Sequence, residues 1–159
     1  PERLGDHLDR LYRAAWALTG SREDADDLVQ ETYARVLARP RLLRSEDDLG
    51  YLLGALRNTF RAGKRALARR PLTTPLLEER DFTAERATAD PQAALEARTV
   101  FRTIASLPPA FRDVIVAVDV AGLSYDHAAR VLGIPPGTVM SRLFRGRQRV
   151  IRLVDGTPP

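Results

Sequence analysis

Near the end of the chain, arginine and hydroxyl side chains recur at a spacing suited to contacts with DNA. Residues 122–152 contain a short amphipathic stretch, a break at Gly133 and a second stretch rich in arginine, an order typical of a helix-turn-helix. In the second stretch Val139, Leu143 and Val150 repeat at about the helical period and should face inward. The polar residues that fall on the opposite, exposed side are Thr138, Ser141, Arg142, Arg145 and Arg149. Arginine forks suit guanine edges or phosphates, so the pattern predicts a DNA-reading helix.

A second group of cations lies earlier in the chain. Between residues 57 and 70 the basic residues occur without an acidic residue among them: Arg57, Arg61, Lys64, Arg65, Arg69 and Arg70. An acidic stretch over residues 78–96 separates this run from the C-terminal arginines. Two basic patches joined by an acidic connector predict that the protein binds a polyanion at two separate sites. For either run alone, the alternative is an ordinary solvated helix face.

Carboxylates cluster on an otherwise basic protein between residues 23 and 31. Asp27, Gln30 and Glu31 stand at i, i+3 and i+4, so on a helix they share a face away from the apolar stripe. Acid–base chemistry, or a metal site that includes Asp24, is conceivable but would require groups that converge in a cleft. Glu23 and Asp24 can be explained by the helix dipole, whereas the other three lie too deep in the helix. We therefore favour a docking face for a basic protein partner.

Composition excludes several classes of function. The 159 residues carry a formal charge of +4, no cysteine and two histidines that are far apart, so disulfides, thiolate zinc sites and thiol nucleophiles are excluded. The sequence has no phosphate-binding glycine loop and no nucleophile motif, and it predicts neither an enzyme nor a cofactor. Because no apolar run approaches the roughly 20 residues that cross a bilayer and no secretory signal precedes the first helix, we expect a cytoplasmic protein without membrane insertion.

Hydrophobic periodicity predicts an all-α fold. Leu4 to Leu18 marks a first helix closed by Gly20, and Ser21 with Asp24 resembles a capping box for a second. The expected buried face of the second helix is Ala25, Leu28, Val29, Tyr33, Val36 and Leu37. A third helix opens near Ser45 and buries Leu49, Leu52, Leu53, Leu56 and Phe60. These helices can close a small bundle over residues 1–70.

A linker is predicted at residues 71–90, with one helical turn near residues 76–80. Residues 91–155 follow as a four-helix unit that ends in the helix-turn-helix. Its first two helices are marked by Leu95, Val100, Ile104 and Leu107, and by Phe111, Val114, Ile115 and Val118.

Several segments together resemble bacterial RNA polymerase sigma factors. Residues 21–37 (SREDADDLVQETYARVL) are similar to the core-polymerase-binding helix of region 2, and residues 52–65 (LLGALRNTFRAGKR) are similar to the −10-element helix. Residues 107–114 (LPPAFRDV), 122–125 (GLSY) and 134–147 (IPPGTVMSRLFRGR) are similar to the −35-reading domain of region 4. With these two domains and a short linker, the chain is identified as a member of the extracytoplasmic-function (ECF) group.

The resemblance implies a role for each candidate residue. Asp27, Gln30 and Glu31 would contact the β′ clamp helices of core RNA polymerase, and the β flap is a second implied contact. Promoter DNA at −10 would be bound by Asn58, Arg57, Arg61, Lys64 and Arg65. A flipped-out base would enter a pocket in the loop around residues 41–48. The −35 element would meet Thr138, Ser141, Arg142, Arg145 and Arg149. An anti-sigma factor is a further implied partner.

Three positions depart from the family pattern. Tyr51 is the aromatic residue nearest to a place where many members carry tryptophan, Met140 occupies a place often held by lysine, and His127 replaces a capping glutamate. The alternative hypothesis is a repressor or activator that binds DNA alone through its helix-turn-helix. Such a protein would leave the acidic face at residues 27–31 without a purpose.

Overall fold

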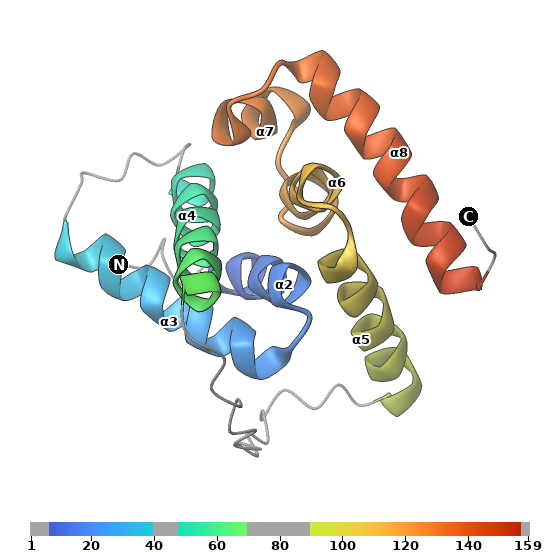
Figure 1. The fold of residues 1–159 in the computed structure, drawn as a ribbon, viewed down its shortest axis with the longest axis horizontal. Helices are drawn as coiled ribbons and strands as arrows, with labels where there is room; N and C mark the ends of the chain where they lie inside the picture. The colour runs from blue at the N-terminus through green and yellow to red at the C-terminus, as the bar shows by residue number, and fades with distance from the viewer. Residues whose placement is uncertain (1–6, 40–47, 70–89, 157–159) are drawn as a thin grey trace.

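The computed structural model describes residues 7–39, 48–69 and 90–156. In this part of the chain every regular element is helical, which confirms the all-α prediction (Figure 1). The elements in order are α2 (Leu8–Thr19), α3 (Arg22–Ala38), α4 (Asp48–Arg69), α5 (Pro91–Ser106), α6 (Pro109–Ile115), a π-helical turn η1 (Val116–Val120), α7 (Tyr125–Leu132) and α8 (Pro136–Asp155). Several predicted features lie outside the described residues: Ser45, residues 41–47 of the expected base pocket, residues 71–89 of the expected linker and the turn near residues 76–80.

Local capping sets the helix boundaries that the sequence predicted. Gly20 ends α2 in the left-handed conformation at φ 78°, and the Ser21 hydroxyl accepts a hydrogen bond of 3.3 Å from the amide of Asp24. Asp90 caps α5 in the same manner through the Gln92 amide at 3.0 Å. A polar cap replaces a hydrogen bond that the first helical turn cannot make within the helix, so each boundary is encoded within a few residues.

Helix α2 lies at the centre of the molecule, with α3 and α4 on one side and α5 and η1 on the other (Figure 1). Its small residues Ala14, Ala15 and Ala17 are fully buried and let neighbouring helices approach closely. Trp16 packs on Phe101 of α5 with ring centroids 4.4 Å apart. The N-terminal helices α2–α4 and the C-terminal helices α5–α8 therefore share one continuous hydrophobic core.

One expectation about burial was wrong. Leu37 was expected in the buried face of α3 but is 66% exposed, and it lies in the last turn of that helix. Thr32 is instead fully buried in α3, where its hydroxyl donates to the Leu28 carbonyl at 2.7 Å. This hydrogen bond satisfies the polar atom within its own helix, so threonine can occupy a core position.

Candidate functional site

The acidic face of α3 lies on the surface, as the sequence indicated. Asp27, Gln30 and Glu31 are all exposed, and Glu31 makes an i, i+4 ion pair of 3.0 Å with Arg35. That pair is solvated on both sides and adds little stability. Asp27 and Glu31 border a groove of about 690 Å³ between α3 and α4, which Lys64 and Leu67 line from the other side.

The carboxylates of α3 do not converge. Within the described residues no three His, Cys, Asp or Glu side chains are placed to hold a metal ion. The metal-site alternative for Asp24, Asp27 and Glu31 therefore has no geometric support. Burial raises the pKa of Tyr33, which lies on the same helix.

The basic side chains of α4 occupy two different environments. Asn58, Arg61, Lys64 and Arg65 are exposed, with the Lys64 ammonium 4.9 Å from the centre of the Phe60 ring. Arg57 is turned towards the C-terminal helices and donates from Nε to Asp113 Oδ2 at 2.9 Å. The structure thus brings four of the five predicted −10 residues to one solvent-facing stretch and places the fifth in an ion pair.

Arg57 belongs to a small charge network that the sequence analysis missed. Asp113 also accepts from Arg112, whose Nε is 3.1 Å and whose Nη2 is 3.0 Å from Oδ1. The Arg112 guanidinium lies 4.9 Å from the centre of the Phe60 ring on α4. Arg112 and Asp113 are both buried. Two adjacent charged residues within the otherwise apolar stretch 109–115 were the sequence signal that could have indicated a buried ion pair.

Helices α7 and α8 form the predicted helix-turn-helix. The Ser124 hydroxyl accepts from the His127 amide at 3.1 Å, Gly133 ends α7 in the left-handed conformation at φ 69°, and Pro136 opens α8. Val139 and Leu143 are buried and Val150 is partly buried, which holds the opposite side of α8 towards solvent. The local signals therefore specify the motif almost completely.

The predicted −35 residues differ in exposure. Ser141, Arg145 and Arg149 are exposed, whereas Thr138 and Arg142 are partly buried. The guanidinium of Arg149 lies 4.5 Å from the centre of the Phe111 ring, so this arginine rests against α6. Thr138, Ser141, Arg142 and Arg145 lie in the N-terminal half of α8, the part of a recognition helix that meets base edges.

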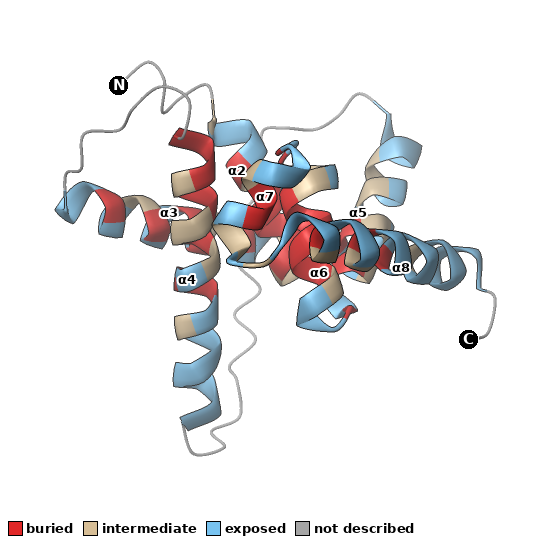
Figure 2. Cartoon of the chain, turned by 90° about the horizontal axis from the view of Figure 1, so that it is seen from above, coloured by how far each residue is buried: buried red, intermediate tan, exposed pale blue. Residues whose placement is uncertain are grey.

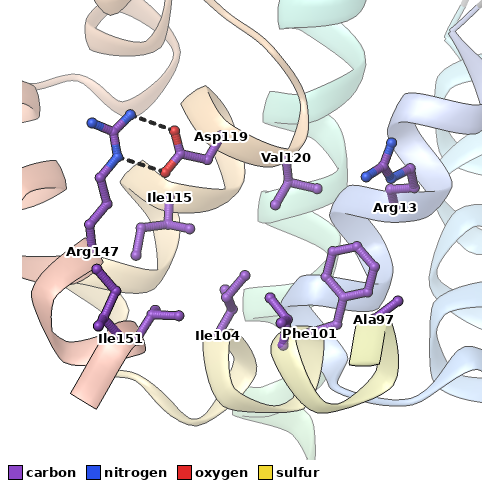
Figure 3. Close-up of a pocket in the computed structure, with 11 residues that line it drawn as sticks. Arg13, Ala97, Phe101, Ile104, Ile115, Asp119, Val120, Arg147 and Ile151 are labelled. Atoms are coloured by element: carbon purple, nitrogen blue, oxygen red, sulfur yellow. Dashed lines mark hydrogen bonds and ion pairs between the residues drawn. The ribbon is translucent and has the colours of Figure 1, made fainter. Parts of the chain in front are cut away.

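A second arginine of α8 is fixed within the protein. Arg147 donates to both carboxylate oxygens of Asp119, at 3.0 and 2.7 Å (Figure 3). These hydrogen bonds raise the pKa of the Arg147 guanidinium above its ordinary value. The pair stands at the edge of a pocket of about 540 Å³ between α2, α5, η1 and α8, lined by aliphatic residues such as Ile104, Ile115 and Ile151 (Figure 3).

Over the described ranges, no helix combines the length and apolar character needed to cross a membrane.

Two family models match the chain. The model for Sigma-70 region 2 matches residues 4–70, and the model for Sigma-70 region 4 matches residues 97–150. Together these matches include α2–α4 and most of the C-terminal helices.

Curated relatives are similar over nearly the whole chain. The ECF RNA polymerase sigma factor SigE of Mycolicibacterium smegmatis is 36% identical over 160 residues, which cover 94% of this chain and 59% of that protein. The sigma factor EcfG of Rhodopseudomonas palustris is 34% identical over 92% of this chain and 81% of its own length. The chain thus spans less than two thirds of the SigE relative and most of EcfG.

Solved structures share the fold. The sigma factor RpoE of Bartonella quintana, determined in complex with the anti-sigma factor NepR, superimposes with a TM-score of 0.72 at 22% identity over 99% of this chain and 97% of that one. CnrH, determined in complex with the cytosolic domain of CnrY, gives a TM-score of 0.69 at 24% identity over 99% of this chain and 88% of the other. From these matches and its region 2 and region 4 helices, the chain belongs to the ECF family of RNA polymerase sigma factors.

Proposed function

We propose that this chain binds core RNA polymerase and directs it to promoters, where the N-terminal helices open DNA at −10 and the C-terminal helix-turn-helix grips −35. The observation that carries this proposal is the separation of charge: an exposed acidic face on α3, an exposed basic stretch on α4 and a second basic helix, α8. A promoter-opening subunit needs one surface for a protein and two for nucleic acid. The role is non-catalytic, because binding energy alone would replace the stacking lost on melting.

The α3 face would dock on the clamp helices of the β′ subunit. Asp27, Gln30 and Glu31 are exposed on one helix, and Asp27 and Glu31 line the groove between α3 and α4 together with apolar Leu28 and Phe60. Carboxylates around an apolar groove suit a basic amphipathic helix.

The aliphatic pocket of Figure 3 would receive an apolar segment of polymerase, for which the β flap is the candidate. Ile151 lines this pocket and is 59% exposed, and Leu153 and Val154 of the same helical end are also exposed, so apolar surface gathers there. An anti-sigma factor is a further expected partner for the same surfaces.

The decisive experiment reverses charge on α3. Asp27→Lys combined with Glu31→Lys should abolish co-purification with core polymerase, because like charges would face a basic partner. Glu96→Lys, an exposed reversal on α5, is the matched control and should retain binding. Transcription by purified core enzyme on genomic DNA, with mapped 5′ ends, supplies the functional readout.

The outcomes separate this function from a stand-alone DNA-binding protein. Loss of polymerase binding with retained affinity for duplex DNA supports the sigma function. Wild-type protein that adds no initiation to core polymerase alone would refute it.

A further inference from the structure

Helix α8 is held near its middle by two neighbouring contacts with α6 and η1. A Cβ added at Gly146 would lie 2.8 Å from Ile115 Cδ1, so α6 and α8 approach closely there. The next residue, Arg147, donates to both carboxylate oxygens of Asp119 on η1, and the two side chains point towards each other (Figure 3). Both contacts act on the turn of α8 that directly follows its predicted DNA-reading half.

The pair of Arg147 with Asp119 differs in kind from the apolar contacts of α8. Val139 and Leu143 are buried, but apolar contact is non-directional, so it holds a helix down without fixing the roll about its axis. A guanidinium that binds both oxygens of one carboxylate has a defined plane and direction. The ion pair is therefore suited to set the roll of α8.

A widened helical turn carries Asp119 to this position. The Ala121 amide donates to the Val116 carbonyl at 2.8 Å, so the hydrogen bond joins residues five apart. A π turn of this kind holds one residue more than an α turn, which changes the side on which later side chains emerge by about 100°. Such turns occur frequently at functional sites.

Arg147 faces away from the residues predicted to contact DNA. It stands two positions from both Arg145 and Arg149, and two positions turn a helix by about 200°, so its side chain leaves α8 on nearly the opposite side. The side chains of Arg147 and Asp119 are 48% and 33% exposed, so the pair adds little to the stability of the fold. Neither a DNA contact nor fold stability accounts for it.

The roll of α8 decides whether its side chains reach base edges. Side-chain tips lie about 6 Å from a helix axis, so a roll of about 10° moves each tip by about 1 Å. N–H···O hydrogen bonds span about 2.7–3.2 Å, and such a shift breaks them. Attraction to phosphates changes less, because the Coulomb energy falls gradually with distance. A changed roll therefore lowers sequence specificity more than overall affinity.

We infer that Arg147 is a positioning residue for −35 recognition: clamped to Asp119, it sets the roll of α8 so that Ser141 and Arg145 meet base edges, while Arg147 itself contacts no DNA. The inference rests on the proposed function, which identifies α8 as the reading helix. Asp119 is the second member of the clamp, although it lies outside the helix-turn-helix.

The test compares promoter duplexes with a native or a scrambled −35 element, taken from the 5′ ends mapped in the transcription experiment. The full chain is assembled with core polymerase, and its affinity for each labelled duplex is measured by fluorescence anisotropy. Arg147→Gln and Asp119→Asn should each lower the native-to-scrambled affinity ratio about three- to fivefold, since an exposed ion pair shifts a population by at most about fivefold. The double variant should match the single variants, because all remove the same pair.

Arg98→Gln is the matched control, because it removes one exposed arginine from α5 and should keep the wild-type ratio. The ratio also separates positioning from a loss of folded protein, which would lower both affinities equally. Over a salt series, Arg147→Gln should keep the wild-type slope. A slope reduced by about 0.9 would reveal a phosphate contact of Arg147 and overturn the inference.

Two further results would overturn the positioning role alone. One is an unchanged ratio in Arg147→Gln when the wild type prefers the native element. The other is tighter binding of both duplexes by Asp119→Asn at an unchanged ratio, because Asp119 would then merely restrain a DNA-binding cation. A wild type that neither initiates nor prefers the native element would instead overturn the proposed function, and this inference with it.

Discussion

The two ends of α4 belong to one helix but face different surroundings. Residues 48–60 carry all of its buried side chains, whereas residues 61–69 are exposed apart from partly buried Ala62 and extend away from the rest of the protein (Figure 2). Arg57 stands near the boundary and is paired, while Arg61, Lys64 and Arg65 remain open to solvent. The same helix thus anchors the fold with one end and offers cations to a ligand with the other.

Such a division of one helix lets a small protein keep a basic surface available. The buried end supplies the apolar contacts that hold the helix rigid, so the exposed end can present charges at fixed intervals without contributing to the core. If the two ends are as separate in energy as in position, substitutions at the buried end should cost much stability and substitutions at the exposed end little.

The largest difference in stability is expected between two leucine substitutions, one at each end of α4. Leu56→Ala empties a fully buried position and should lower the free energy of unfolding by about 2–5 kcal/mol. Leu67→Ala changes a side chain that is 66% exposed and should alter stability by less than about 0.5 kcal/mol. Urea denaturation followed by circular dichroism checks both, and equal losses would show that the exposed end is structural.

A smaller loss of stability is expected where the buried end of α4 meets the exposed end, at the ion pair of Arg57 with Asp113. Asp113→Ala leaves Arg57 and buried Arg112 without their anion and should lower the free energy of unfolding by about 3 kcal/mol. Asp119→Ala breaks the more exposed pair with Arg147 and should lower it by less than about 1 kcal/mol. Thermal unfolding of the two variants measures the difference, and similar values would mean that the Arg57 pair is also solvent-screened.

The smallest effect on stability is expected for a cation of the exposed end. Arg65→Ala should change the free energy of unfolding by less than about 0.5 kcal/mol. In complex with core polymerase it should weaken binding to single-stranded −10 DNA and reduce the salt slope by about 0.7 if one phosphate contact is lost. Arg10→Ala, an exposed arginine on α2, serves as the control and should leave the slope unchanged. Fluorescence anisotropy over a salt series gives the slopes, and identical values for both variants would remove Arg65 from the DNA surface.

Local features of the fold were predictable because they depend on neighbours in sequence. The Ser21 and Ser124 caps, the left-handed Gly20 and Gly133 and the inward Val139 all follow from spacing over a few residues. The exposed position of Asp27, Gln30 and Glu31 followed from the same periodicity. Their roles towards polymerase and DNA stay predictions.

Contacts between distant segments could not be predicted in the same way. Arg57 was assigned to DNA together with Arg61, because both occur in one basic run, yet Asp113 lies 56 positions further along the chain. Leu37 fits the apolar stripe of α3 but no helix covers that end. Whether a charged side chain is paired and whether a leucine is buried both depend on neighbours from distant parts of the chain. Those neighbours are known only from the tertiary packing.

Taken alone, the amino-acid order determined which stretches are helical, where they begin and end, and which face of each is polar, since these depend on hydrogen bonds and side-chain periodicity within a few turns. The tertiary structure decided that α2 joins both halves into one core, that α7 rests on α4, and that one predicted DNA-binding arginine is held by a buried carboxylate. These outcomes depend on shape and charge brought together from remote parts of the chain, where a single small residue such as Gly50 decides how closely two helices can approach.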